Sequence, residues 1–202
     1  SRVGALIHYS ETHDNPRLAE KGPVWSLMRN SLCALTSING GYGFTNGVEW
    51  LADERVNVHN SRGMAWGSEE NLIDELSRLN KLIAHHPCFR EGTEFRRLSP
   101  NDSPIYALER TSACGQQVIV LVNSDHKLPQ NFKINNDNIV AAASWIDLVA
   151  DAPFETSCQS DHANFRLQPG QVCCLAKGEE EFAIDYRSQR ARIAWAIQCL
   201  AA

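Results

Sequence analysis

The stretch of sequence that decides the fold reads Tyr9-Ser10-Glu11-Thr12-His13-Asp14-Asn15-Pro16-Arg17-Leu18. It follows a short apolar run over residues 3–7, a pattern typical of a buried strand. The X-Pro pair then pushes the chain out of regular structure. A histidine, an aspartate and an arginine are thereby gathered on the loop at the end of a strand, where parallel α/β folds keep their chemistry. Taken alone, the His13-Asp14 pair is more often a plain turn capped by its aspartate.

The residues after this loop predict one complete turn of a parallel β/α unit. Residues 22–38 read as a helix that begins with Gly-Pro, carries apolar side chains near helical spacing and is stopped by Asn-Gly-Gly. Residues 42–44 then read as a short buried strand followed by a loop. Because crossovers between parallel strands are right-handed, both loops are expected on the same rim. Asp14 and Glu49, one on each loop, are therefore expected to face one pocket.

Composition and charge exclude several classes of partner. The chain has 202 residues, 43% of them hydrophobic and 21% charged, as in an ordinary soluble globular protein. A net charge of -5 argues against a nucleic-acid partner, because no basic face is available to displace counterions. No apolar run approaches the roughly 20 residues of a membrane span, and no signal-peptide pattern opens the chain. We therefore expect a cytoplasmic protein with a neutral or small ligand, and no membrane partner.

No metal or cofactor is expected from the sequence. The seven cysteines contain no CxxC pair, so neither a disulfide framework nor a zinc site is indicated, and reduced, buried thiols are the better interpretation. The glycine-rich residues 40–47 lack the spacing of a phosphate loop and enter a strand rather than a helix. The adjacent His85 and His86 point to different sides of a helix, so they read as a C-terminal cap that complements the helix dipole rather than as a metal pair.

A second helix is expected between residues 68 and 86. Ser68 reads as its N-cap, with Glu69 and Glu70 in the first turn where carboxylates oppose the helix dipole. Leucine and isoleucine side chains at helical spacing then form one apolar face. The His-Pro pair at residues 86–87 ends the helix.

From residue 93 onward the pattern changes to short apolar or alternating runs separated by turn residues. These runs predict seven strands of an antiparallel sandwich, at residues 95–98, 105–110, 117–122, 130–134, 144–149, 164–167 and 171–176. The last segment, residues 179–202, begins with glutamates and continues with an apolar stripe, which predicts a linker and a helix. That helix is expected either to dock on the sandwich or to lead to a further domain.

The stretch around His13 resembles a sequence region of the α-amylase superfamily, glycoside hydrolase family 13, in which an apolar strand is followed by Asn-His-Asp and often by Pro-Arg. Thr12 stands where that region usually has asparagine. Three later segments also resemble this family. Gly47-Val48-Glu49 matches a Gly-x-Glu loop after the eighth barrel strand, residues 62–66 resemble an Arg-x-Pro-Met-x-Trp segment with glycine in place of proline, and residues 80–92 resemble the final barrel helix with its His-Pro ending.

The resemblance implies an α+β chain that holds the last β/α units of a TIM-type (β/α)8 barrel in residues 1–92 and an antiparallel β-sandwich in residues 93–178. It implies that Asp14 and His13 are catalytic and hydrogen-bond the hydroxyls of the sugar being cleaved. It also implies that Arg17, Glu49 and Trp66 bind substrate, with the indole stacking on a sugar face. A fixed carboxylate and an imidazole suit this role, because their hydrogen bonds to ring hydroxyls strengthen as positive charge develops on the ring.

A retaining glycosidase also needs a carboxylate nucleophile and a separate general acid. In the family these come from earlier barrel strands, so the resemblance implies a carboxy-terminal piece of an α-glucan-active hydrolase or transglycosylase. The expected substrate is an α-glucan or a maltooligosaccharide, the expected partner is the remainder of the barrel, and the piece alone is expected to be inactive. Chain Ser1 to Ala202 begins without methionine, which also favours a fragment.

Three alternatives remain open at this point. Residues 41–43, which read Gly-Tyr-Gly, together with the glutamates at 69–70 and Asn80, also resemble maltosyltransferases that build glucan, so transfer competes with hydrolysis. A non-catalytic relative would use its sandwich as a carbohydrate-binding or interaction module. An unrelated α+β protein would place Asp14 and Glu49 on different rims.

Overall fold

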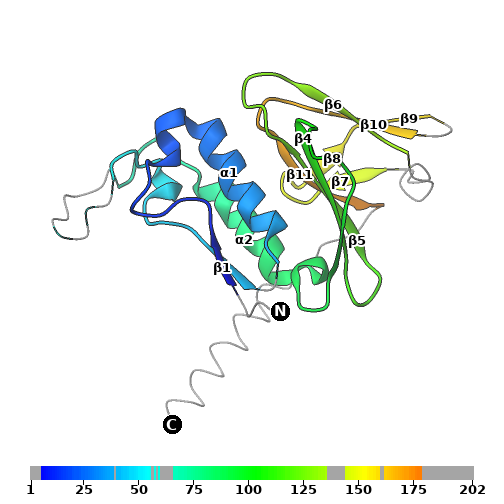
Figure 1. The fold of residues 1–202 in the computed structure, drawn as a ribbon, viewed down its shortest axis with the longest axis horizontal. Coiled ribbons are helices and arrows are strands. Elements are labelled where there is room, and N and C mark those ends of the chain that lie inside the picture. The colour runs from blue at the N-terminus through cyan, green and yellow to red at the C-terminus, as the bar shows by residue number, and fades with distance from the viewer. Residues whose placement is uncertain are drawn as a thin grey trace, which may run out of the picture.

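The computed structural model describes residues 6–38, 40–55, 57, 59, 66–135, 144–159 and 162–178. These residues form an α+β structure in layers (Figure 1). A two-stranded parallel sheet lies on one side of two helices, and a six-stranded antiparallel sheet lies on the other side of them. A three-stranded antiparallel sheet completes the sandwich. Within these ranges, no helix combines the length and the apolar character needed to cross a membrane.

The first layer is the predicted β/α unit. Strand β1 (Leu6–Tyr9) leads through the 3-10 turn η1 (Leu18–Lys21) and helix α1 (Pro23–Thr36) to strand β2 (Gly40–Gly43). The two strands pair in parallel, with Leu6 opposite Gly40 and Tyr9 opposite Gly43. Helix α1 begins with proline in its first turn, as its sequence predicts. The expectation of a strand–helix–strand unit is therefore confirmed. The prediction that its first strand is buried is wrong, because Leu6, Ile7 and Tyr9 of β1 are exposed in the part of the chain that the structure describes.

The second helix starts later than predicted. A 3-10 turn, η2 (Val48–Trp50), is followed by α2 (Ile73–His85) and by the 3-10 turn η3 (Pro87–Phe89). The prediction of Ser68 as N-cap is wrong, because its hydroxyl donates to the Trp50 carbonyl at 2.6 Å and closes a loop instead. The side-chain oxygen of Asn71 accepts a hydrogen bond from the Ile73 amide, and Asp74 and Glu75 supply the carboxylates of the first turn.

In the part of the chain that the structure describes, nine strands build the two antiparallel sheets. The larger sheet has the order β3-β4-β5-β11-β7-β8, and the smaller sheet has the order β6-β10-β9. All seven predicted strands are present, and the two that the sequence did not reveal, β8 and β9, are only three residues long. The bounds are β3 (Glu94–Arg97), β4 (Ile105–Thr111), β5 (Gln117–Asn123), β6 (Gln130–Ile134), β7 (Trp145–Asp147), β8 (Ala152–Phe154), β9 (Ser157–Gln159), β10 (His162–Leu167) and β11 (Val172–Lys177).

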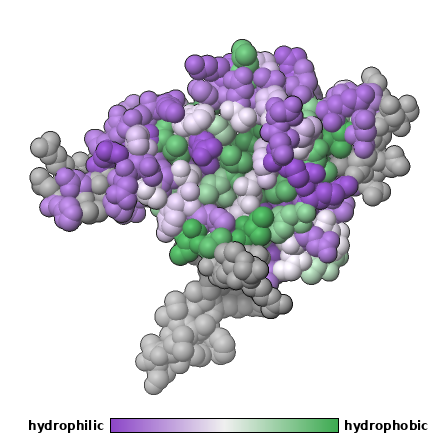
Figure 2. All heavy atoms as spheres, in the orientation of Figure 1, coloured by the Kyte–Doolittle hydropathy of each residue, from purple (hydrophilic) through white to green (hydrophobic). Residues whose placement is uncertain are grey.

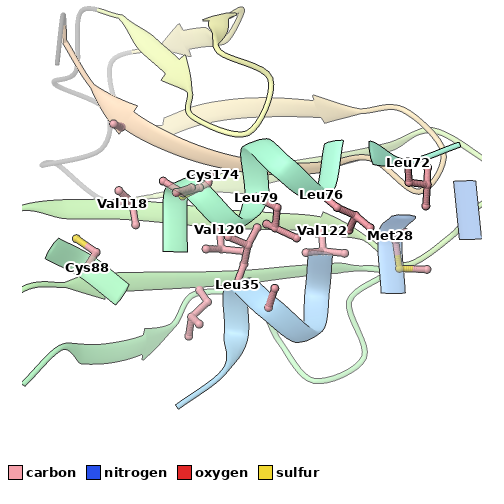
Figure 3. Close-up of a cluster of buried hydrophobic side chains, with 14 of the residues drawn as sticks. Met28, Leu35, Leu72, Leu76, Leu79, Cys88, Val118, Val120, Val122 and Cys174 are labelled. Atoms are coloured by element: carbon pink, nitrogen blue, oxygen red, sulfur yellow. The ribbon is translucent and has the colours of Figure 1, made fainter. Parts of the chain in front are cut away.

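The large sheet is buried on both faces, which explains why its central strands read as continuous apolar runs. On β5, Val118, Val120 and Val122 face helices α1 and α2, and Figure 3 shows them opposite Leu35, Leu76 and Leu79. Ile119 and Leu121 point the other way, into a second cluster with the small sheet. Side chains alternate between the two faces of a strand, so a strand covered on both sides needs apolar residues throughout. The helices and the sheet therefore share one core.

The adjacent cysteines of β11 illustrate the same alternation. Cys173 belongs to the cluster beneath the small sheet, and Cys174 to the cluster beneath the helices. Both are fully buried, and burial raises the pKa of each thiol well above its ordinary value. The prediction of buried thiols is confirmed for these two and for Cys88, while Cys114 is exposed. The predicted linker and helix at residues 179–202 lie outside the described residues.

Candidate functional site

Two loops meet at the carboxyl ends of the parallel strands. The loop after β1 carries His13 and Asp14, and the loop after β2 carries Glu49. Because β1 and β2 run in parallel and in register, both loops leave the same edge of the sheet, as the sequence predicts. The Thr45 hydroxyl donates to the Glu11 carbonyl at 2.9 Å, so the two loops are in direct contact.

His13 and Asp14 are presented to solvent at this edge. Their side chains are 48% and 79% exposed, and His13 Nε2 lies 3.3 Å from Asp14 Oδ1. The backbone beneath them is fixed, because Arg55 Nη2 donates to the Asp14 carbonyl at 2.6 Å and the Asn15 amide donates to the Thr12 carbonyl. An exposed carboxylate and imidazole on a fixed backbone are free to accept and donate hydrogen bonds to an external ligand.

Arg17 does not reach that exposed position. Its side chain is fully buried, and its Nε donates to Glu11 Oε1 at 2.9 Å. Its other nitrogens donate to the backbone carbonyls of Asn46 and Glu54. The prediction that Arg17 contacts substrate is therefore not supported by its position in the structure, since the guanidinium is enclosed by protein groups.

Glu11 lies at this edge too, although no sequence motif points to it. Its carboxylate is buried, and it accepts from Arg17 Nε and from the Leu18 amide. The signal in the sequence is a carboxylate and a guanidinium on opposite sides of the His13-Asp14 turn. A pair of opposite charges flanking a turn is positioned to close that turn once both are removed from water.

Glu49 lies on the side of the edge that faces α2. Its Oε2 accepts from the Gly47 amide at 3.1 Å, and its carbonyl accepts from the Leu72 amide at 2.8 Å. It borders an open hollow of about 460 Å³, and no residue of the β1 loop lines that hollow. The expectation that Asp14 and Glu49 face one pocket is therefore met only in part, since they share an edge but not this hollow. Its lining is Phe44, Glu49, Ile73, Leu76, Ser77, Asn80, Lys81, Ala84 and His85.

Trp66 is 56% exposed, so much of this residue is accessible to solvent. Residues 62–65 of the same sequence segment lie outside the described residues. Within the described ranges, no three side chains of histidine, cysteine, aspartate or glutamate gather as metal ligands.

His86 ends α2 and is completely buried. Its Nδ1 accepts from the Cys88 amide at 3.1 Å. Burial, together with the nearby charge of Arg110, lowers the pKa of His86 to about 4. The histidine pair does end the helix as predicted, but His86 is neutral at pH 7 and adds no positive charge there.

No family model and no curated protein matches the sequence. Solved structures do match. The chain superimposes on an α-amylase from Anoxybacillus with a TM-score of 0.67 at 19% identity, covering 86% of this chain and 38% of that one. The maltogenic α-amylase AmyB from Thermotoga neapolitana matches with a TM-score of 0.68 at 15% identity, covering 86% of this chain and 42% of that one. An α-amylase from Geobacillus thermoleovorans, solved with acarbose, matches with a TM-score of 0.68 at 17% identity, covering 87% of this chain and 39% of that one.

The chain has the fold of the carboxy-terminal part of α-amylases. It spans only about two fifths of the length of the α-amylases it matches. At this level of identity the likeness concerns the α-amylase-like fold itself.

Proposed function

We propose that these residues are the carboxy-terminal part of an α-glucan-active glycoside hydrolase or transglycosylase. The observation that carries the proposal is the exposed His13–Asp14 pair at the carboxyl end of β1, on a chain with an α-amylase-like fold. In this proposal the Asp14 carboxylate accepts a hydrogen bond from a hydroxyl of the reacting sugar ring, and His13 hydrogen-bonds a hydroxyl of the same ring. The matched solved structures include an α-amylase complexed with acarbose and an AmyP variant in complex with maltotriose, which supports an α-glucan or maltooligosaccharide as substrate.

The open parallel sheet supports a partner for this chain. Within the described residues β1 and β2 pair only with each other, and Leu6, Ile7 and Tyr9 of β1 are 45%, 68% and 51% exposed. Hydrophobic surface gathers at the lower edge of the molecule in Figure 2, where Figure 1 draws β1. Parallel strands are normally buried on both faces and paired at both edges. The remainder of a catalytic (β/α)8 barrel would cover these strands.

The chemistry that we assign to Asp14 is stabilisation of the transition state. As the glycosidic bond lengthens, the ring acquires oxocarbenium character, and hydrogen bonds from its hydroxyls to a carboxylate strengthen. A group that binds the transition state more tightly than the ground state raises the rate of the chemical step. The nucleophile and the general acid are supplied by the rest of the barrel in this proposal, so residues 1–202 alone do not turn over substrate.

The other predicted residues take supporting roles. The exposed indole of Trp66 offers a flat apolar face for a sugar ring. Glu49 fixes the turn after β2 through the Gly47 amide and shapes the edge from the α2 side. Hydrolysis and transfer share the same covalent intermediate, so these residues serve either reaction, and the acceptor decides which product forms.

The test uses the protein with its complete native amino-terminal sequence and maltoheptaose as substrate. Asp14→Asn keeps the shape of the side chain and removes its charge. We expect kcat to fall by about 10²–10³-fold, the usual effect of removing one group that stabilises a developing charge. Asp102→Asn, at an exposed turn of the sandwich, is the matched control and should retain full activity. Unchanged kcat in Asp14→Asn would refute the assignment, and product analysis by mass separates hydrolysis from transfer.

A further inference from the structure

We propose that Glu11 and Arg17 are positioning residues that hold His13 and Asp14 in their working geometry. The inference rests on the proposed function and extends it to two side chains that do not touch substrate. Arg17 and Glu11 are 0% and 2% exposed at the side chain, so neither can contact a sugar. Their effect on the reaction must pass through the backbone of the loop between them.

Within the β1 loop, the pair closes the turn that carries Asp14. Arg17 Nε donates to Glu11 Oε1 at 2.9 Å, and the amide of Leu18 donates to Glu11 Oε2 at 2.5 Å. One carboxylate thus binds both a side chain and a backbone amide on the far side of the turn. Hydrogen bonds that involve charged groups are about twice as strong as neutral ones, so the two ends of the turn are firmly joined.

The same arginine ties this loop to the loop after β2. Its Nη2 donates to the Asn46 carbonyl at 3.0 Å, and its Nη1 to the Glu54 carbonyl at 3.4 Å. A second arginine, Arg55, also joins the two loops, because its Nη2 donates to the Asp14 carbonyl at 2.6 Å. The buried ion pair and its carbonyl partners therefore join the Asp14 loop to the loop after β2, together with the hydrogen bonds from Thr45 and Arg55.

The chemistry of the two side chains explains why this task falls to them. A guanidinium is planar and presents donors in a fixed fork, which allows Arg17 to bind a carboxylate and two carbonyls at once. A lysine at the same place would keep the charge but lose the fork. Since the site is buried, water cannot replace the lost donors, and the loop would keep the ion pair with Glu11 but lose its hydrogen bonds to the two carbonyls.

The test compares Arg17→Met and Arg17→Lys in the same protein with its complete amino-terminal sequence. Arg96→Met is the control, because it removes an arginine–glutamate ion pair elsewhere, the more exposed pair of Arg96 with Glu109 on the sandwich. Hydrogen exchange is measured for the amides of residues 12–18 and 45–55 and for those of β5. Maltoheptaose turnover is measured in parallel.

In Arg17→Met we expect the amides of both loops to exchange at least about 10-fold faster while those of β5 stay unchanged, as for a local opening. We also expect kcat to fall by about 10²-fold, since a misplacement of 1 Å costs about that much. Arg17→Lys should be intermediate in both readouts, and Arg96→Met should match the wild type.

Two results would overturn the inference. Unchanged loop exchange and unchanged kcat in Arg17→Met would show that the pair positions nothing. Equally faster exchange in β5 would show that the pair supports the whole fold rather than this edge. The exchange data do not depend on catalysis. Full activity in Asp14→Asn would therefore refute the proposed function, while the exchange data would still test whether the Glu11–Arg17 pair holds the two loops.

Discussion

Arg110 Nη1 donates a hydrogen bond of 2.7 Å to the carbonyl of Leu35 at the last turn of α1. Its Nε donates at 2.7 Å to the carbonyl of Cys88, and its guanidinium lies 4.2 Å from the ring centre of Phe89. Burial lowers the pKa of Arg110 to about 10, which leaves it charged at pH 7. One side chain of the sheet thus caps the helix layer that carries the candidate site.

Arg110→Met should therefore destabilise the protein. It leaves the carbonyls of Leu35 and Cys88 buried without their donor, at a cost of about 1–3 kcal/mol each. Urea unfolding followed by tryptophan fluorescence gives the free energy. Arg166→Met, at an exposed position of β10, is the control and should change stability by no more than about 0.5 kcal/mol. Equal stability of the two variants would show that Arg110 does not join the layers.

The buried, neutral His86 predicts a loss of stability in acid. An unfolded histidine titrates near pH 6.5, whereas folded His86 has a pKa of about 4. Between these values the unfolded state binds a proton that the folded state does not, so stability falls as the pH drops from about 6.5 to about 4. His86→Asn keeps an acceptor for the Cys88 amide and cannot take up the proton.

The free energy of unfolding of wild type and His86→Asn should therefore be compared at several pH values from 7 to 4. Other groups titrate alike in both proteins, so the difference between the curves isolates His86. We expect the wild type to lose more stability than the variant across this window, by on the order of 3 kcal/mol. Parallel curves would contradict a neutral, buried His86.

The described cysteines should differ sharply in reactivity. Cys114 is exposed, and hydrogen bonds with the Ser112 hydroxyl and the Gln116 backbone lower its thiol pKa, which increases the reactive thiolate at neutral pH. Cys173 and Cys174 are buried with raised pKa values. Brief iodoacetamide treatment at pH 7.5, followed by peptide mass spectrometry, should alkylate Cys114 and leave Cys173 and Cys174 unmodified. Labelling of the adjacent pair in folded protein would contradict the packing.

The sequence was informative where one local pattern corresponds to one structure. The helix start at Pro23 and the apolar runs of β5 and β11 were found because each has a distinct spacing. What covers β5 was not predictable, since an apolar run does not say whether a helix or a second sheet lies on either face. The three-residue strands β8 and β9 carry no periodicity and, unlike the equally short β7, they do not lie in a longer run that predicts a strand.

The site residues show the same limit. The sequence predicts His13 and Asp14 on the loop at the end of a strand; the structure has them there and shows in addition that both side chains are exposed. The motif predicts that Arg17 binds substrate, but the Arg17 side chain pairs with Glu11 and is buried in the protein. Ser68 was assigned as a helix cap because serine followed by glutamates favours that role, yet its hydroxyl found the Trp50 carbonyl. In both cases the position of the side chain is decided by a hydrogen-bond partner several residues away in the sequence.

The affinity for acarbose tests the assignment of Asp14 most directly. It is measured by titration calorimetry on wild type and Asp14→Asn, both with the complete amino-terminal sequence. If the Asp14 carboxylate binds the sugar at the reacting position, the variant should bind at least about 10-fold more weakly, as expected for the loss of one charged hydrogen bond of about 1.5–3 kcal/mol. Equal affinity in the two proteins, or no binding by the wild type, would contradict the assignment of this edge as an α-glucan site.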